Sequence, residues 1–282
     1  MIKKKFALIG YPLKHTISPF IHQRLFKLNK IKAEYKLLNI KPEHLDYYYN
    51  TMLKSLDGYN ITIPNKIKIM NFVDKIDYTS KICGSINTVK NNLNKSYGFN
   101  TDINGFLKST KNNKISLTGN IVILGAGGAA RAVSFACSNY AKTITLAIRE
   151  TSFKKAKYIL YTLKNTPAKI KITSINNLNT PIDVLINATP VGMFPNQNAV
   201  LVNENILKNC KCVIDLIYNP YETILLKKAK ANGSQTLGGL DMLVWQAAFA
   251  QKIWNDVDFN IQDINEIIEE SKLEIARKFN EI

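Results

Sequence analysis

The sequence predicts an α/β protein of two domains, in which an N-terminal α/β domain precedes a domain with a doubly wound parallel sheet. The strongest signal lies at residues 121–131, where four apolar residues run into a Gly-Ala-Gly-Gly turn and then into a helix of small residues. Short apolar strands alternate with helical segments along most of the chain, which is typical of βαβ units. A length of 282 residues with 46% hydrophobic content allows two medium domains with real cores.

The glycine-rich turn fits the pattern G-x-G-x-x-A of a Rossmann-type, dinucleotide-binding domain. Gly125 would make the turn, Gly127 would let the backbone approach a pyrophosphate, and Ala130 would let helix and strand pack closely. The N-terminus of the following helix offers free N–H groups and the positive end of the helix dipole to phosphates. The alternative is a glycine-rich turn in an α/β protein of another kind.

The formal net charge is +17, a value that raises the question of nucleic-acid binding. Most of the positive charge comes from scattered lysines, and no basic run is interleaved with stacking aromatic residues. Recognition of phosphates and bases usually favours arginine for its fork of donors. We therefore expect no nucleic-acid partner, but a general anion-attracting field that suits an acidic substrate and a phosphate-rich cofactor. The arginines are Arg24, Arg131, Arg149 and Arg277.

The sequence also argues against three other classes, namely a membrane protein, a metal-binding protein and a secreted protein. No run of about 18 apolar residues exists, so we predict no membrane span and no membrane partner. Cys210 and Cys212 lack a second Cys or His pair at zinc spacing, so we predict no metal site and reduced cysteines. The N-terminal apolar stretch is only about five residues long and runs into Gly10 and Pro12, which favours a first strand over a signal peptide and predicts a cytoplasmic protein.

The first hundred residues are predicted to form βα units. Ser18 is a good N-cap and Pro19 a good first residue for the first helix. Strands are expected at residues 5–10, 33–40, 58–66 (broken by a proline) and 82–89, helices at 19–28, 42–56 and 67–80, and a turn at 91–95.

Polar side chains gather in the loops and at the strand ends of this region, where open α/β sheets bind their ligands. Thr16 and Ser18 either cap a helix or offer two hydroxyls to a carboxylate. Asp102 is either an N-cap or a buried carboxylate that faces a lysine of another loop. Asn60 and Thr62 share one strand face, which is either exposed to solvent or turned to a ligand. The clusters are Thr16 with Ser18, Asn60 with Thr62 and Lys66, Asn87, and Asn100 with Asp102.

The second half of the chain is predicted to continue as a parallel sheet with right-handed crossovers. We place the first domain at residues 1–105 plus 238–282 and the second at residues 106–237. Strands are expected at residues 143–148, 169–174, 183–193 (with a terminal loop), 212–218 and 235–237, and helices at 128–139, 152–164, 221–232, 242–254 and 261–280.

Eight stretches, in the order of the chain, resemble the shikimate dehydrogenase family and span most of residues 6–255. The resemblance implies a substrate-binding catalytic domain followed by an NADP-binding Rossmann domain. It also implies the reversible, NADPH-dependent reduction of 3-dehydroshikimate to shikimate in aromatic amino acid (chorismate) biosynthesis. The stretches are residues 10–22, 60–66, 84–88, 98–102, 125–131, 187–193, 215–223 and 238–246.

The resemblance implies a role for each polar cluster. Thr16 and Ser18 stand at the S-x-S motif whose hydroxyls hold the substrate carboxylate, and Thr16 keeps the hydroxyl while it adds a methyl group. Lys66 and Asp102 are implied to be the catalytic pair. Hydride addition to a ketone creates an oxyanion that needs a proton, and a charged lysine held by a carboxylate can supply it. The remaining substrate contacts are implied for Asn60, Thr62, Asn87, Tyr218 and Gln246.

The resemblance also implies the cofactor contacts. Arg149 matches the arginine of the family's N-R-T motif and predicts NADP, because an arginine near the end of the second strand accommodates the 2′-phosphate. Glu150 replaces the threonine of that motif, and an acidic residue in this region is typical of NAD enzymes. The implied cofactor-binding residues are Gly125, Ala126, Gly127, Gly128, Ala129, Arg149, Thr189, Gly239 and Met242.

Three alternatives stay open at this point. Thr16 and Glu150 are compatible with a quinate/shikimate dehydrogenase that accepts both ring acids or prefers NAD. The net charge of +17 suggests a non-catalytic sensor or a nucleic-acid-binding protein, although a sensor needs no proton donor such as Lys66. A folate-linked dehydrogenase of similar build is disfavoured by the N-x-T-x-P-x-K stretch at residues 60–66. The sequence does not distinguish a homodimer from a monomer.

Overall fold

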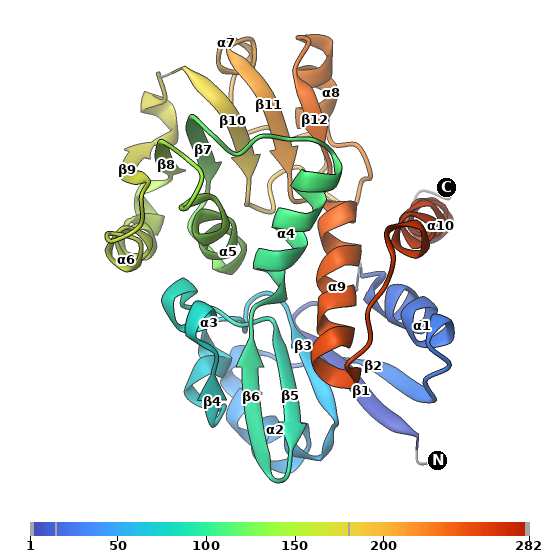
Figure 1. Cartoon of the computed structure of the whole chain (residues 1–282). Helices are drawn as coiled ribbons and strands as arrows, with labels where there is room; N and C mark the ends of the chain where they lie inside the picture. Colours follow the sequence, from blue (N-terminus) through green and yellow to red (C-terminus); the bar gives the residue numbers. More distant parts are fainter. Residues whose placement is uncertain (1–2, 15, 180, 280–282) are drawn as a thin grey trace. The chain divides into compact units, whose positions relative to one another are not determined.

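The computed structural model describes residues 3–14, 16–179 and 181–279, and the chain divides into two compact units (Figure 1). The first unit comprises Met1–Gly105 with Leu243–Ile282, and the second comprises Phe106–Met242. Both divisions fall inside helices, namely α4 (Thr101–Asn112) and α9 (Gly239–Asn255). Residues 238–242, which we expected in the first domain, lie in the second unit instead.

A six-stranded mixed sheet with the order β2-β1-β3-β5-β6-β4 forms the centre of the first unit. β1 pairs in parallel with β2 and β3, whereas β5 pairs antiparallel with both β3 and β6. The second half of this sheet is therefore a hairpin rather than a further βα unit. The strands are β1 (Lys4–Gly10), β2 (Ala33–Asn39), β3 (Gly58–Ile61), β4 (Lys75–Ile76), β5 (Thr88–Asn92) and β6 (Lys95–Phe99).

Helices cover both faces of this sheet (Figure 1). Successive side chains of β1 point to opposite faces, so each face has its own buried cluster. Ala7 and Ile9 belong to a buried cluster with the α2 side chains. Phe6 and Leu8 pack in a second cluster with α1 and with Trp254 of α9. The other helices of this unit are α1 (Ser18–Leu28), η1 (Pro42–His44), α2 (Leu45–Thr51), η2 (Leu53–Ser55), η3 (Lys68–Asn71), α3 (Tyr78–Cys83) and α10 (Ile261–Phe279).

Three expected elements of the first unit differ from the structure. The helix expected at residues 42–56 is divided into η1, α2 and η2. The helix expected at 67–80 is replaced by η3, β4 and α3, because β4 pairs with β6 and the Asp77 side chain caps α3. Gly84, at φ 70°, ends α3, so the strand expected from residue 82 begins only at Thr88.

The second unit contains six parallel strands in the order β12-β11-β10-β7-β8-β9. Numbered within the unit and counted from β9, this is the order 3-2-1-4-5-6 of a doubly wound fold, as the sequence predicts. The order reverses between β7 and β10, whose carboxyl ends therefore flank the point at which such sheets bind ligands. The strands are β7 (Asn120–Leu124), β8 (Thr143–Ile148), β9 (Lys169–Ser174), β10 (Ile182–Asn187), β11 (Cys210–Asp215) and β12 (Gln235–Leu237).

The central strands of this sheet are buried on both faces. The apolar residues of β7 are at most 1% exposed, as expected for a parallel strand with a covering layer on each side. None of the helices that the structure describes is long and apolar enough to cross a membrane. The helices of this unit are α5 (Gly128–Cys137), η4 (Glu150–Ser152), α6 (Phe153–Thr162), η5 (Ile175–Asn177), α7 (Glu204–Leu207) and α8 (Ile224–Ala231).

Candidate active site

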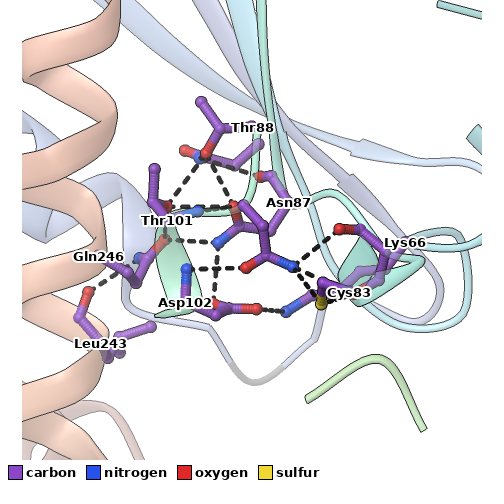
Figure 2. Close-up of polar contacts among 11 residues, drawn as sticks. Lys66, Cys83, Asn87, Thr88, Thr101, Asp102, Leu243 and Gln246 are labelled. Carbon is purple, nitrogen blue, oxygen red and sulfur yellow. Dashed lines mark hydrogen bonds and ion pairs between the residues drawn. The ribbon is translucent and has the colours of Figure 1, made fainter. Parts of the chain in front are cut away.

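Lys66 and Asp102 form an ion pair in the first unit. The Lys66 Nζ atom donates a hydrogen bond of 2.6 Å to Asp102 Oδ2, and the two side chains are only 15% and 7% exposed (Figure 2). Lys66 lies in the turn after β3, where its carbonyl oxygen accepts from the Ile86 N–H at 3.0 Å. The lysine ammonium is thus held beside a carboxylate at a place that water reaches poorly.

Asn100, not Asp102, caps the first turn of α4. The Asn100 Oδ1 atom accepts from the Asp102 N–H at 3.1 Å, while its Nδ2 donates to the Ser85 carbonyl at 2.8 Å. The Asp102 carboxylate is consequently available for other contacts, and its Oδ1 accepts from Asn87 Nδ2 at 2.8 Å. Of the two alternatives for Asp102, the structure shows the buried carboxylate that faces Lys66.

Asn87 lies at the centre of the polar network in Figure 2, and contacts at both ends of its amide orient it. The Asn87 Nδ2 atom also donates to Gln246 Oε1 at 3.3 Å. Its Oδ1 accepts from the Thr101 N–H at 2.7 Å and from the hydroxyls of Thr101 and Thr88, each at 3.1 Å. Gln246 is held in turn by a hydrogen bond of 2.8 Å from its Nε2 to the Leu243 carbonyl. The network therefore connects α4, α9 and the segment before β5.

Asn60 joins the same network from β3. Its Nδ2 donates to the Asn87 carbonyl at 3.2 Å and to Thr88 Oγ1 at 3.0 Å, and its Oδ1 accepts from the Tyr35 hydroxyl at 2.8 Å. Both N–H groups of the Asn60 amide are thereby engaged, so any further hydrogen bond must be accepted by Oδ1. Asn60 is only 4% exposed, so it does not lie on a solvent-exposed strand face. Thr62, which follows β3, is half-buried.

Thr16 and Ser18 contact each other at the start of α1. The Thr16 hydroxyl donates to Ser18 Oγ at 3.1 Å, and the Ser18 N–H donates to Thr16 Oγ1 at 3.1 Å. Ser18 is the first helical residue and Ile17 stands at the N-cap position, so the prediction that Ser18 caps the helix is wrong. The Thr16 hydroxyl, which lies just before the helix, accepts from the Ser18 N–H instead. Lys278 of α10 donates to the Thr16 carbonyl at 3.0 Å.

His22, to which the sequence assigns no role, is a fully buried residue next to this network. Its ring stacks on Tyr35 with centroids 4.2 Å apart, and Gln251 Nε2 lies 2.9 Å from His22 Nδ1. Burial lowers the pKa of His22 to about 3, so the ring is neutral at pH 7 and fixes Tyr35, which orients Asn60. The only signal in the sequence is its spacing on the buried face of α1.

In the second unit, Gly125 makes the turn after β7. Its φ is 107°, a left-handed conformation that L side chains rarely adopt. A Cβ added there would lie 2.9 Å from Thr189 Cγ2, so the loop after β10 packs directly on this turn. The Gly125 N–H donates to the Ala147 carbonyl of β8 at 3.1 Å. Turn, β8 and the β10 loop are therefore mutually fixed.

Gly127 has a different role, since its backbone is unstrained and the space above it is open. It stands at the N-cap position of α5 with φ −79°, and a Cβ added there would meet no atom within 4 Å. Gly128 and Ala129 begin α5, and Ala126 is 3% exposed. The open backbone at a helix N-terminus is the cradle that a pyrophosphate requires, so these residues fit a dinucleotide.

The remaining predicted cofactor residues lie in the same unit. Arg149 and Glu150 are both exposed and adjacent at the end of β8, where η4 begins. Position 239 requires a glycine because the backbone of Leu216 packs closely against it, and an added Cβ would lie 2.1 Å from the Leu216 carbonyl oxygen. Met242, farther along α9, is 9% exposed.

Tyr218 is half-buried in the segment that follows β11.

The structure joins most of the predicted catalytic and substrate residues of the first unit in one network. These are Lys66, Asp102, Asn60, Asn87 and Gln246. Thr16 and Ser18 form a separate pair. Among the residues that the structure describes, no group of three or more His, Cys, Asp or Glu side chains could hold a metal ion.

Comparison with known proteins supports the resemblance in the sequence. A family model described as the shikimate dehydrogenase substrate binding domain matches residues 8–89. A relative from Clostridium perfringens (strain 13 / Type A), named shikimate dehydrogenase (NADP(+)), is 40% identical over 278 residues, which cover 95% of this chain and 98% of the relative. The chain belongs to the shikimate dehydrogenase family.

Solved structures of the shikimate dehydrogenase family have the same fold along nearly the whole chain. A chorismate mutase/shikimate 5-dehydrogenase fusion protein from Clostridium acetobutylicum matches with a TM-score of 0.87 and 33% identity, over 98% of this chain and 99% of that chain. The shikimate 5-dehydrogenase of Thermus thermophilus, solved in complex with NADP(H) and shikimate, matches with a TM-score of 0.84 and 27% identity, over 95% and 99% of the two chains. The α/β fold predicted from the sequence is confirmed.

Proposed function

We propose that this chain catalyses the reversible, NADP-dependent interconversion of 3-dehydroshikimate and shikimate. The observation that carries the proposal is the poorly exposed Lys66–Asp102 pair within the polar network of the first unit. Membership of the shikimate dehydrogenase family supports the reaction, and the complex of the Thermus thermophilus relative supports the substrate and the cofactor.

Lys66 is the proton donor in this proposal. A bound nicotinamide supplies the hydride for ketone reduction and accepts it in the reverse direction. Lys66 Nζ stabilises the negative charge that develops on the ketone oxygen and gives it a proton, and it takes the proton back when the alcohol is oxidised. Asp102 holds the ammonium group by the 2.6 Å hydrogen bond, so it fixes the position of the donor before substrate arrives.

The other polar residues of the first unit would bind the ring acid. We assign the ring hydroxyls to Thr62, Asn87, Gln246 and the Oδ1 atom of Asn60. We assign the carboxylate to the hydroxyls of Thr16 and Ser18. Tyr218, which belongs to the second unit, would add a further substrate contact. Substrate binding is accordingly proposed for Met1–Gly105 with Leu243–Ile282, a proposal supported by the family model at residues 8–89.

The second unit, Phe106–Met242, would bind the cofactor. The turn at Gly125–Ala129 would hold the pyrophosphate through backbone N–H groups, with contacts from Thr189, Gly239 and Met242. Arg149 would hold the 2′-phosphate, since a guanidinium presents paired donors to a phosphate.

A spectrophotometric assay tests the proposed function. Pure protein mixed with shikimate and NADP+ should produce the absorbance of the reduced nicotinamide, and no signal at any protein concentration would refute the proposal. Initial rates should be higher with NADP+ than with NAD+ at equal concentration. A quinate/shikimate dehydrogenase is the second candidate, because exposed Glu150 stands beside Arg149. Faster turnover with quinate and NAD+ would favour this second candidate.

We also propose a cytoplasmic protein without a nucleic-acid partner. The net charge of +17 is the reason to test the second point. A gel-shift assay on duplex DNA over a range of salt concentrations should show no specific complex, whereas salt-resistant binding would contradict the proposal. Sedimentation of the pure protein distinguishes a homodimer from a monomer.

A further inference from the structure

Asp215 is a buried carboxylate to which the proposed function gives no role. It is the last residue of β11 and pairs in register with Asn187, the last residue of β10. Both lie at the carboxyl edge of the parallel sheet, beside the switch point. Asp215 is 0% exposed, and a carboxylate in such a place is costly unless its oxygens accept hydrogen bonds.

Three neutral donors serve this carboxylate. Oδ1 accepts from Asn187 Nδ2 at 3.0 Å and from the Ile217 N–H at 3.1 Å, and Oδ2 accepts from the Thr223 hydroxyl at 2.7 Å. The donors come from three segments, namely the end of β10, the segment after β11 and the N-cap of α8. One side chain therefore ties together the two loops that leave the carboxyl ends of β10 and β11.

The contact with Asn187 decides which way its amide points. A carboxylate oxygen only accepts, so Asn187 must present its Nδ2 to Asp215 and its Oδ1 to the other side. On that side, Asn187 Oδ1 accepts from the Thr189 N–H at 3.1 Å and from the Thr189 hydroxyl at 2.7 Å. Thr189 Oγ1 accepts in turn from the Val191 N–H at 3.2 Å, so the loop after β10 is folded around the oriented amide.

The chain of contacts ends at the glycine turn. The Thr189 methyl group is the nearest atom to the place that a Gly125 Cβ would occupy, at 2.9 Å. On the other side of Asp215, the Ile217 carbonyl accepts from the Gly239 N–H at 3.0 Å, which fixes the residue before Tyr218 to the start of α9. The hydrogen bonds of Asp215 thus reach Thr189 and Gly239, two of the proposed cofactor residues.

We infer that Asp215 is a positioning residue for the nicotinamide dinucleotide: through Asn187 it sets Thr189 against the Gly125 turn, and through Ile217 it fixes Gly239 at the start of α9. This inference rests on the proposed function. Asp215 itself touches neither substrate nor reacting atoms. What the position needs is an acceptor at Oδ1, and a neutral amide supplies one as well as a carboxylate does.

The test is a direct measurement of NADP+ binding by calorimetry, with shikimate KM as the internal comparison. In Asp215→Ala the dissociation constant for NADP+ should rise about ten- to hundredfold, the usual size of a lost hydrogen bond to a charged group, while the shikimate KM changes less than about twofold. Asp215→Asn keeps an acceptor at Oδ1, so NADP+ affinity should stay within about threefold of wild type. An equal loss of NADP+ affinity in Asp215→Ala and Asp215→Asn would overturn the inference, as would an unchanged NADP+ affinity in Asp215→Ala.

A matched control variant and a double-mutant cycle separate an effect on cofactor positioning from an effect on protein stability. Asp183, near the opposite end of β10, accepts from the Asn120 N–H at 2.7 Å and pairs with Lys211 at 2.7 Å. Asp183→Ala should lower the melting temperature and leave NADP+ affinity unchanged. Asp215→Ala and Thr189→Ala should be non-additive in NADP+ affinity, because both act through Thr189. Additive losses would overturn the route through Asn187.

Asn187→Ala provides a second variant in case Asp215→Ala does not fold. It removes the bridging amide but leaves Asp215 its other two donors, and it should weaken NADP+ binding as Asp215→Ala does. Unchanged affinity in this variant would refute the inference. A wild-type protein that binds no NADP+ would instead refute the proposed function, so the two failures are distinguishable.

Discussion

The two units build their proposed sites from different parts of the chain. In the first unit the site consists of side chains, Lys66, Asn87 and Asp102, which neighbouring side chains hold in place. In the second unit it consists mainly of backbone, at Gly125 and Gly127, with side chains such as Thr189 packed against it. A side-chain site recognises one arrangement of functional groups, whereas a backbone cradle recognises a phosphate through N–H groups that every residue carries.

This difference explains what substitutions should do in each unit. Loss of a side chain in the first unit removes a chemical group from the hydrogen-bond network. Gain of a side chain in the second unit fills space that a ligand needs. Lys66→Ala is a change of the first kind and Gly127→Ala a change of the second kind. His22 and Asp215 allow the pH response of the two units to be compared.

Removal of Lys66 should have the largest effect. Lys66→Ala eliminates the proton donor, and turnover should fall by roughly 10²–10⁴-fold, the usual contribution of general acid catalysis, while shikimate still binds. Steady-state kinetics with NADP+ and shikimate measure both quantities. Lys68→Ala is the matched control, since Lys68 is an exposed lysine two positions away that contacts the Pro42 carbonyl. Near-normal turnover in purified Lys66→Ala would remove Lys66 from the mechanism.

His22 should make the protein less stable in acid. Burial lowers the pKa of His22 from 6.5 to about 3, so the unfolded chain binds a proton between these values and the folded chain does not. The free energy of unfolding should therefore decrease as the pH falls from 6.5 toward 3, by on the order of 4 kcal/mol in all. Urea unfolding of wild type and His22→Gln at several pH values measures the difference. A wild-type slope identical to that of His22→Gln would contradict the prediction.

Asp215 should have the opposite effect on stability, so that its contribution to the free energy of unfolding decreases as the pH rises. Burial raises the pKa of Asp215 from 3.8 to about 6, although hydrogen bonds from Thr223, Ile217 and Asn187 oppose the shift. The folded chain keeps a proton that the unfolded chain has lost, so the stabilisation is complete below about pH 3.8 and lost as the pH rises through about 6, on the order of 3 kcal/mol in all. Relative to wild type, Asp215→Asn should become more stable across this range in urea unfolding. If the difference does not vary with pH, Asp215 does not titrate in this way.

Gly127→Ala should separate folding from cofactor binding. Its φ of −79° suits alanine and its Cβ would meet no atom within 4 Å, so the melting temperature should not fall. The methyl group occupies the space proposed for the pyrophosphate, so NADP+ affinity should drop by about tenfold or more, which corresponds to about 1.4 kcal/mol of binding free energy. Shikimate KM serves as the control. Wild-type NADP+ affinity would show that the cradle lies elsewhere.

Arg149→Ala should have the smallest effect and a selective one. The substitution removes the proposed partner of the 2′-phosphate, so the KM for NADP+ should rise about tenfold while the KM for NAD+ stays nearly constant. Glu150→Ala is the matched control, because Glu150 is the adjacent exposed residue of opposite charge. Parallel changes for both cofactors would mean that Arg149 does not contact the 2′-phosphate.

The sequence by itself determined the doubly wound sheet, because strands such as β8 and β9 have local apolar patterns whose observed bounds agree with the predicted ones. It also predicted that the polar side chains between positions 60 and 102 lie in loops and near strand ends. The helix expected at 67–80 failed because pairing of the two-residue strand β4 with β6 overrides local helix propensity, which no local pattern records.

Only the tertiary structure decided how these residues are used. Asp102 was left between a cap and a buried carboxylate, and the structure settled this, because α4 begins at Thr101 and the Asp102 carboxylate accepts from Lys66 and Asn87. The sequence assigned no role to His22, Tyr35 or Asp215, since a buried histidine or aspartate looks like any other until its neighbours are known. Local patterns reflect periodic burial along one element, whereas hydrogen-bond networks join segments that are far apart in the chain.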